Sequence, residues 1–405
     1  MQQSAPWQFA ARMSRKFATA CSLAMAGCLL VASAQASWLD PLETPSIPSK
    51  KVANSMLLDI ARAGDRLVVV GERGHIAFSD DEGFTWNQAK TPVSSTLTAV
   101  YFVNDNEGWA VGHDGAVLHS SDGALNWEKQ LDGFAVNQNV LDQSEKNKED
   151  ATQYLNSIKN SGNGRLISQA EERLENLTYA VEDARADLED KSTKPFLDVW
   201  FEDVKTGFIV GAYGLIFRTE DGGKHWQDWS AHVPNPDRFH FNAITSLGNK
   251  RLMIVGEMGT ILRSVDAGNN WQKLQSPYAG SLFGINSVMD NKVLLAFGLR
   301  GNVLRSDNFG STWKSMDSGT EQGLSEGFVS NDRTIYLVGN GGAFLKGVDE
   351  GQKWIVNSLP GRKAAAGIIE SKSGYFVIVG EGGVELIDKA GNRLPNVIKS
   401  IEFKG

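Results

Sequence analysis

The sequence predicts an all-β protein, a seven-bladed β-propeller with an inserted α-helical hairpin. Two observations predict it: a motif that recurs at a fixed period, and one polar stretch that interrupts the period. The motif is a glycine pair, a short apolar run and then Ser/Thr-x-Asp-x-Gly-x-x-Trp; the seventh copy has lost the tryptophan and keeps Asp388 and Gly391. The first glycines are Gly71, Gly112, Gly211, Gly256, Gly298, Gly339 and Gly380, spaced by 41 to 45 residues except for one step of 99. Because about 40 residues make one four-stranded blade, seven copies predict seven blades.

Each repeat is expected to supply four antiparallel strands. In the second copy, residues 97–103 alternate as an inner strand, 109–112 are short and apolar, 116–119 form a third strand, and Trp127 begins the outermost one. Clusters of Gly, Asn and Asp separate these runs, as hairpin turns require. Closing seven such units into a ring removes long exposed sheet edges.

The Asp and Trp of each motif are predicted to be structural. The carboxylate can accept backbone N–H bonds within its own turn, and the Ser or Thr hydroxyl can do so more weakly. The Trp can bury a large apolar area between neighbouring blades. An active site needs one asymmetric constellation rather than six similar turns. The structural set is Asp81 with Trp86, Asp122 with Trp127, Asp221 with Trp226, Asp266 with Trp271, Asn308 with Trp313, and Asp349 with Trp354.

The N-terminal residues 1–36 have the pattern of a secretory signal peptide. Three basic residues precede a small, apolar stretch that ends in the A-x-A site Ala34-Gln35-Ala36. Cleavage there predicts a periplasmic protein without cysteine, because both cysteines lie in this segment. Lipidation at Cys28 is the alternative, and it would anchor the chain. Residues 37–54, which contain three prolines, are expected to be an extended segment leading into a propeller over 55–405.

Net charge and composition restrict the classes of partner that the protein can bind. The formal net charge is −8, and removing the three basic residues of the signal segment, which has no acidic residue, makes it −11. Such an acidic surface disfavours binding to nucleic acid, and it argues against a polybasic patch that would bind a membrane surface. The sequence has no Walker-type loop and no set of His, Asp or Glu at metal-ligand spacing. We therefore expect a monomer with no catalytic residue, no metal and no cofactor.

Residues 137–194 depart from the repeat and predict a helical hairpin between blades two and three. The stretches 142–160 and 165–191 are charged and nearly free of Gly and Pro, and the second has apolar residues at steps of three and four. Strand alternation places this arm on the face of the Gly-x-x-Gly turns. It is either a flap over the ring or a partner-docking arm, and its charged sides favour docking.

The same face carries the candidate binding residues. Mixed acidic, basic and aromatic side chains around a propeller mouth suit a peptide or protein surface. These candidates come from the Gly-x-x-Gly turns and the loops between blades: Glu72, Arg73, His113, Asp114, Tyr213, Arg238, His240, Glu257, Tyr278, Arg300, Arg362 and Glu381. A C-terminal strand at 397–403 is expected to help close the ring, on blade seven or on blade one.

The repeat resembles the Asp-box, or BNR, repeat first associated with sialidases. Its fuller form, with Val-Gly-x-x-Gly ahead of the Ser-x-Asp-x-Gly-x-x-Trp run, is more similar to the photosystem II stability/assembly factor-like family over about 56–394. That resemblance implies a non-catalytic exported scaffold. It would assist assembly or operation of a membrane-protein complex by protein–protein docking, and would meet the membrane only through its partner.

Two other functions stay open at this point. One is a carbohydrate-binding or sialidase-like protein, whose arginine trio could come from Arg73, Arg238, Arg300 and Arg362, with Tyr213 or Tyr278 as nucleophile beside Glu257. Nothing in the sequence selects such a set, and the Arg-Ile-Pro signature of sialidases is absent; Ser46-Ile47-Pro48 is the nearest string. The other is an accessory subunit of an envelope transporter.

Overall fold

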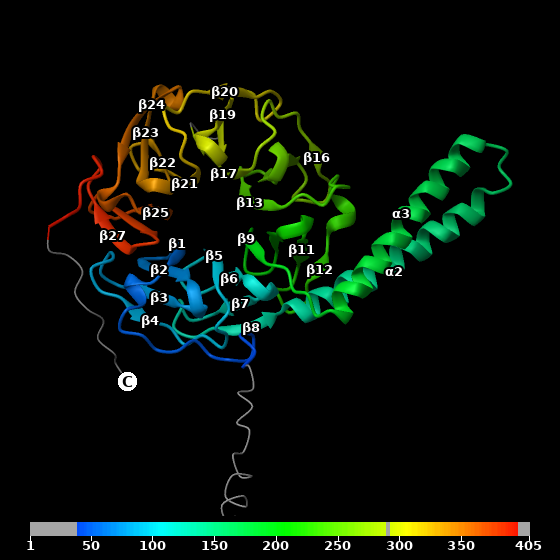
Figure 1. Cartoon of the computed structure of the whole chain (residues 1–405), viewed down its shortest axis with the longest axis horizontal. Coiled ribbons are helices and arrows are strands. Elements are labelled where there is room, and N and C mark those ends of the chain that lie inside the picture. Colours follow the sequence, from blue (N-terminus) through cyan, green and yellow to red (C-terminus); the bar gives the residue numbers. More distant parts are fainter. Residues whose placement is uncertain (1–38, 289–291, 396–405) are drawn as a thin grey trace, which may run out of the picture. The chain divides into compact units, whose positions relative to one another are not determined.

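The computed structural model describes residues 39–288 and 292–395. The chain divides into two compact units, Met1–Asp40 and Pro41–Gly405, and the architecture below is that of the second. This unit is a ring of seven antiparallel sheets with a helical hairpin at its side (Figure 1). The predicted fold, an all-β seven-bladed propeller with an inserted helical hairpin, is confirmed. In the described part of the chain, no helix is long and apolar enough to cross a membrane.

Each blade is built from consecutive strands, in the order in which they occur in the chain. Blade one contains β1 Leu57–Ala63, β2 Arg66–Gly71, β3 Ile76–Ser79 and β4 Asn87–Gln88, and blade two contains β5 Leu97–Phe102, β6 Gly108–Gly112, β7 Val117–Ser120 and β8 Glu128–Leu131. Blade three contains β9 Phe196–Phe201, β10 Gly207–Gly211, β11 Ile216–Thr219 and β12 Gln227–Asp228. Blade four contains β13 Phe241–Ser246, β14 Leu252–Gly256, β15 Ile261–Ser264 and β16 Gln272–Lys273. Blades five to seven contain β17 Leu282–Val288, β18 Val293–Gly298, β19 Val303–Ser306 and β20 Lys314–Met316; β21 Leu324–Val329, β22 Ile335–Gly339, β23 Ala343–Val348 and β24 Lys353–Ser358; β25 Ala365–Glu370, β26 Phe376–Gly380 and β27 Gly383–Ile387.

The first glycine of each repeat is required by a close approach of two strands. A Cβ on Gly71 would lie 2.1 Å from the Met56 carbonyl oxygen, and one on Gly256 would lie 2.0 Å from that of His240. The same crowding occurs at all seven first glycines. In each case the second strand ends against the start of the first, so no side chain fits between them. This explains why the glycine recurs even in blade seven, whose motif has lost its tryptophan.

The apolar core lies mainly between blades. Trp127 of blade two, for example, packs in one cluster with Val68 and Val70 of blade one. Its indole Nε1 donates to the Ala124 carbonyl at 3.3 Å, which fixes the ring in its own turn. Since each cluster of this kind draws on two neighbouring sheets, one blade alone cannot bury its apolar faces.

The Asp-box turns are hydrogen-bonded as predicted for a structural motif. Asp81 accepts from the Thr85 amide at 2.8 Å and from the Thr85 hydroxyl at 2.7 Å. The Ser79 hydroxyl donates to Asp81 and accepts from the Gly83 amide, both at 2.8 Å. Asn308 fills the same place in blade five, accepting from the Thr312 amide while its own amide donates to the Thr312 hydroxyl. An amide therefore serves as well as a carboxylate.

Blade six corrects the predicted set, because Asp349 and Trp354 do not form an Asp-box. Gly347 stands where the other motifs have Ser or Thr, so no hydroxyl is present to hold the turn. Strands β23 and β24 instead pair over six residues each, joined by a tight turn at Asp349–Gly351. The Asp349 carboxylate pairs with Lys353 at 3.5 Å, and Trp354 is only partly buried.

Arginine side chains tie neighbouring Asp-box turns together. Arg218 of blade three donates to Asn269 in the turn of blade four at 2.7 Å. Arg263 of blade four donates to the Phe309 carbonyl in the turn of blade five at 2.8 Å, and Arg305 of blade five reaches the Glu350 carbonyl in blade six. All three directly precede the Ser or Thr of their motif. This position therefore supplies a contact to the next blade.

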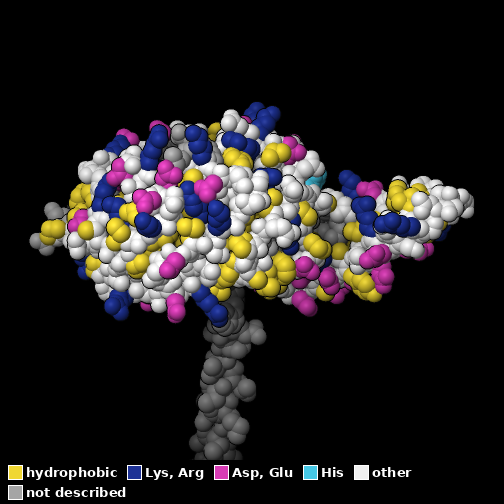
Figure 2. All heavy atoms as spheres, turned by 90° about the horizontal axis from the view of Figure 1, so that it is seen from above, with side chains coloured by type: hydrophobic (Ala, Val, Ile, Leu, Met, Phe, Trp, Pro, Cys, Tyr) yellow, Lys and Arg dark blue, Asp and Glu magenta, His cyan; other side chains and the backbone are white. Residues whose placement is uncertain are grey.

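The arm is two antiparallel helices, α2 Gly133–Ile158 and α3 Gly164–Glu189. The predicted start of the first helix at 142 is wrong by nine residues. Asp132 caps the helix by accepting the Ala135 amide at 3.1 Å, and Val136 is buried against the ring. A glycine at the first helical position concealed this start in the sequence. Figure 2 shows the arm extending from the ring, with basic side chains along one edge and acidic ones along the other.

Ring closure joins blade seven to blade one through side chains in the described residues. Val377 and Leu386 of blade seven pack with Trp86 of blade one. The predicted closing strand at 397–403 lies outside the described residues, as do the signal segment 1–36 and Cys28.

Glu82 is the polar centre of this junction. Arg62 donates to both of its carboxylate oxygens, at 3.0 and 2.9 Å, and the Lys372 amide of blade seven donates to one of them at 2.9 Å. Arg62 also donates to the Glu370 carbonyl at 2.9 Å. Burial alone would raise the pKa of Glu82, but the hydrogen bonds from Arg62 and from the Lys372 amide hold that pKa below its usual value.

Replacing this carboxylate should loosen the ring. Glu82→Gln leaves Arg62 without its charged partner, so we expect the free energy of unfolding to fall by about 2 kcal/mol in a denaturant titration. Asp65→Asn is the matched control, because it removes an exposed ion pair to Lys372 across the same junction. We expect that change to leave the free energy of unfolding nearly unchanged, because water screens an exposed ion pair. Equal losses in the two variants would contradict a closing role for Glu82.

Candidate functional site

One face of the ring collects the Gly-x-x-Gly turns and the loops between blades. In blade one, Arg73 and Gly74 have φ of 57° and 67°, and the His75 amide donates to the Glu72 carbonyl at 3.0 Å. Two successive residues of positive φ closed by this bond make a type I′ turn, which favours Asn, Asp or Gly at its first central position. The equivalent turns of blades two to six have the same positive φ values.

Several of these turns hold side chains that the conformation disfavours. The first central residue is Arg73, Asp114, Tyr213, Met258 or Arg300 in blades one to five, and Gly341 in blade six. A left-handed residue other than Gly, Asn or Asp costs about 1 kcal/mol or more. Tyr213 and Met258 are also 55% and 53% exposed, so burial in the core does not explain them. Strain kept at an exposed side chain points to a use for that side chain at the surface.

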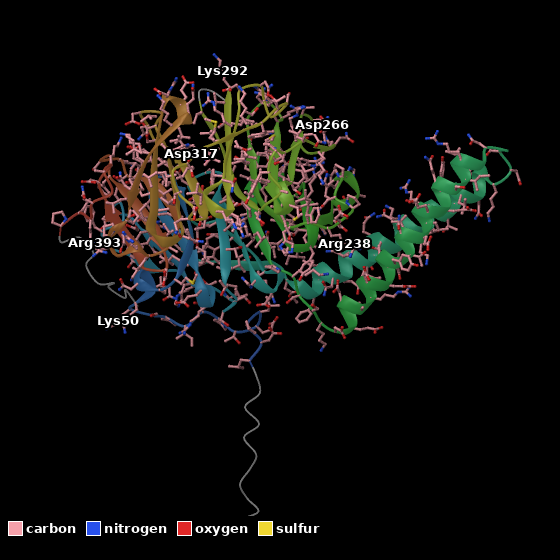
Figure 3. The ribbon with its side chains drawn as sticks, turned by 45° about the horizontal axis from the view of Figure 1, so that its top comes forward. Lys50, Arg238, Asp266, Lys292, Asp317 and Arg393 are labelled. Carbon is pink, nitrogen blue, oxygen red and sulfur yellow. The ribbon has the colours of Figure 1, made fainter. Side chains whose placement is uncertain are left out.

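Four of the twelve candidate residues meet at the junction of blades three and four, beside the arm. The Tyr213 ring packs edge-on against His240, with centroids 5.0 Å apart. His240 Nε2 lies 4.0 Å from Glu257, and Arg238 Nη1 lies 3.3 Å from Asp183 of α3. Figure 3 shows Arg238 on the side of the ring that faces the arm. The structure thus brings this group together from separate loops.

Several candidate carboxylates, Glu257 of this group among them, also serve the fold. Glu72, Glu257 and Glu381 each accept the backbone amide just before the first strand of their own blade, from Met56, His240 and Ala364. Asp114 accepts from the Ser95 hydroxyl at 2.8 Å and from the Thr193 hydroxyl at 3.3 Å, which braces the root of the arm. These carboxylates hold backbone in place.

The remaining candidates are spread around the ring. Tyr278 donates its hydroxyl to the Leu299 carbonyl at 3.1 Å. Arg73, His113, Arg300 and Arg362 lie on blades one, two, five and the loop from blade six to seven, and their side chains are in no ion pair within the described residues. The four arginines considered for a sialidase trio therefore come from four separate places on the ring.

A groove lies between the arm and the ring, with a volume of about 870 Å³. We call it the arm groove. One wall is formed by α2 and α3, and the other by the loop 230–238, which carries Pro234 and Pro236. Tyr213 and Asp228 also line it. Neither Asp228 nor the arm's contribution to a groove was predicted, because both depend on how the hairpin leans on blade three.

A second cavity of about 500 Å³ occupies the mouth of the central channel. Asp59, Asp198 and Glu326 line it, each at the third position of an inner strand. Asp59 accepts the Val100 amide of blade two and Asp198 the Ile244 amide of blade four, both at 2.8 Å. Burial raises the pKa of Asp59 and Asp198 to about 7 and that of Glu326 to about 8, and their mutual repulsion adds to the last two.

These three carboxylates were missed by the sequence analysis. Their signal is a single acidic residue within an apolar inner strand, as in Leu57-Leu58-Asp59-Ile60. In residues 39–288 and 292–395, no group of three or more His, Cys, Asp or Glu side chains is placed to hold a metal ion. The arrangement of this face suits contact with a protein segment: exposed aromatic and apolar side chains, unpaired charges and an elongated groove.

Comparison with protein families agrees with the resemblance seen in the sequence. A family model described as "Photosynthesis system II assembly factor YCF48" matches residues 33–151 and 180–327, more than half of the chain. The predicted membership of a photosystem II assembly factor-like propeller family is confirmed. The unmatched stretch 152–179 includes the tip of the arm.

Individual relatives match more narrowly. "Photosystem II assembly lipoprotein Ycf48" of Synechococcus sp. (strain CC9902) is 41% identical over 54 residues, which are 13% of this chain and 16% of the relative. The match thus spans less than a fifth of that relative's length. A solved structure described as "YCF48 bound to D1 peptide" has a TM-score of 0.57 at 17% identity and covers 83% of this chain and 93% of that chain. YCF48 from Cyanidioschyzon merolae has a TM-score of 0.56 at 18% identity, covering 82% and 94%. At such identities the likeness shows the fold.

Relief of the turn strain should be measurable. Met258→Gly removes an exposed side chain from a left-handed position, so we expect the free energy of unfolding to rise by about 0.5 kcal/mol. Val265→Gly is the control: Val265 is also exposed but lacks positive φ, and there glycine should destabilise by about 0.5–1 kcal/mol. Denaturant titration of both variants checks the opposite signs. If Met258→Gly lowers the free energy of unfolding as much as Val265→Gly does, the turn at Met258 is not strained.

The channel carboxylates predict a pH dependence. Their pKa values are higher in the folded chain than in the unfolded one, so the folded state binds more protons between about pH 4 and pH 8. Their contribution to stability is complete below that window and is lost as the pH rises through 7 to 8. We expect thermal unfolding midpoints to fall over this range, and Glu326→Gln to flatten the slope. An unchanged slope would show that Glu326 ionises normally.

Proposed function

The chain belongs to the photosynthesis system II assembly factor YCF48 family, and from this premise we propose that it is a non-catalytic, exported docking scaffold. It binds a segment of a membrane-protein complex and assists the assembly or operation of that complex. One related structure is described as bound to a D1 peptide, and curated relatives are named photosystem II assembly lipoproteins. Those descriptions concern the relatives. They support a protein segment as the ligand here.

The observation that carries the proposal is the strain on the Gly-x-x-Gly face. Arg73, Tyr213, Met258 and Arg300 occupy turn positions where glycine would be easier to accommodate. Selection for stability alone would remove such residues, so their retention supports a contact made by their side chains. Tyr213 and Met258 sit on adjacent blades, and two of the four clustered candidates, Tyr213 and Arg238, line the arm groove. We therefore assign docking to this part of the face.

The arm supports a partner particular to this chain. Its outer part, 152–179, is not matched by the family model. A flap would need to lie on the ring, whereas Figure 1 shows both helices extending away from it. We assign the arm to docking, and place the protein on the periplasmic side, either free after cleavage at Ala36 or anchored at Cys28. The lipoprotein names of the relatives support export of this chain.

Affinity purification from crosslinked, detergent-solubilised envelopes tests the scaffold. We expect an integral membrane complex to co-purify with the tagged protein and to be identified by mass spectrometry. The variant Tyr213→Gly, Met258→Gly, Arg300→Gly should lose most of that complex while unfolding no earlier, because glycine suits all three positions.

The control carries the same number of changes on the opposite face: Leu125→Ser, Val204→Ser and Val265→Ser, all at exposed apolar side chains. It should retain the complex. Equal recovery by the two variants, or recovery of glycans with no membrane protein, would contradict the proposal.

A further inference from the structure

The arm groove contains a buried acidic group with no charged partner of its own. Asp228 is 9% exposed and lines the groove. Its Oδ1 accepts the Ser230 amide at 2.8 Å. In the described part of the chain it is in no ion pair. Burial raises the pKa of Asp228, while the hydrogen bonds from Ser230 and the nearby Arg238 and His232 act in the opposite direction. A cation placed in the groove would stabilise its ionised form.

Most other charged side chains that line the groove are already in ion pairs. Lys194 pairs with Asp187, and Arg238 pairs with Asp183 at 3.3 Å. Three charged side chains are then left outside any ion pair of the described residues: Asp228, Asp237 and Arg173. Arg173 is on the outer arm wall, whereas both acids are on the ring side. The inner half of the groove is therefore negative.

The shape of the groove restricts the occupant. Its lining runs along residues 137–147 of α2 and 173–187 of α3, opposite a loop with two prolines, so it is elongated along the helices. Tyr179 of α3 and Tyr213 present exposed rings to it. Flat aromatic surfaces and an elongated cavity of about 870 Å³ suit a few residues of extended chain.

We propose that the arm groove binds an extended protein segment that carries a single lysine or arginine, and that this side chain pairs with Asp228. The inference rests on the proposed docking function and names the chemistry of its ligand. Asp228 is then a specificity-determining residue. The arm helices supply one side of the site. The insertion therefore contributes to binding, although the propeller ring closes through other contacts.

A random dodecapeptide display library, selected on the protein expressed with its own N-terminal segment, tests this. We expect selected peptides to share one basic residue flanked by apolar ones. The most enriched peptide, labelled with fluorescein, should bind Asp228→Asn at least about tenfold more weakly by anisotropy. Its counterpart with norleucine in place of the basic residue should bind the unaltered protein equally weakly.

Two further variants keep the test decisive. Asp237→Asn removes the same charge at the groove edge and should change affinity less than about threefold. Tyr179→Ala alters an exposed arm residue that cannot unfold the ring, and should weaken the peptide if it lies in the groove. An unfolding midpoint equal to that of the unaltered protein shows that Asp228→Asn is folded. If Asp228→Asn does not fold, the affinity of Tyr179→Ala for the peptide shows whether the peptide lies in the groove.

Selection of acidic or purely apolar peptides, no enrichment at all, or equal binding by Asp228→Asn would overturn the inference. The outcomes are separable from those of the docking function. If basic peptides bind the groove but no envelope complex is recovered, the scaffold proposal is contradicted and the proposed groove ligand is not. If an envelope complex is recovered equally with Asp228→Asn, the proposed groove ligand is contradicted and the scaffold proposal is not.

Discussion

The structure depends on apolar contact between blades. In the ring, each cluster of buried side chains draws on two neighbouring sheets: Trp127 of blade two, for example, packs with Val68 and Val70 of blade one. A sheet of four short strands has no adequate core of its own, so every blade needs both neighbours. The ring is then stable only when closed, and the last junction, at Trp86 and Glu82, matters as much as the six formed by adjacent repeats.

The two faces of the ring divide the tasks. On the Asp-box face, side chains such as Arg218 and Arg263 are bonded to the next turn. On the Gly-x-x-Gly face, the backbone makes the turns, and several residues at their tips, such as Met258 and Arg300, are exposed. Met258 and Arg300 are therefore free to vary without changing how blades meet. A surface of this kind can be fitted to a partner while the ring stays the same.

Most of the fold could be predicted from the sequence, because the period and the close approach at Gly71 or Gly256 recur in every blade. The site could be predicted only in part. Tyr213, Arg238 and His240 were found as loop residues, but their grouping depends on how blades three and four and the arm pack together, which no local pattern encodes. Blade six was misjudged because Gly347 removes the hydroxyl that makes an Asp-box, although Asp349 and Trp354 remain.

The root of the arm has a consequence for how a client would be held and released. Asn137 donates to the Ser192 carbonyl, which joins the two ends of the hairpin, and Thr193 donates to Asp114, which fixes the second end to blade two. A helix of 26 residues extends about 39 Å. A bound chain that touches both the arm and the ring mouth is held at two points with a fixed span between them. Each contact can then be weak, since one raises the effective concentration of the other, and a client can leave stepwise.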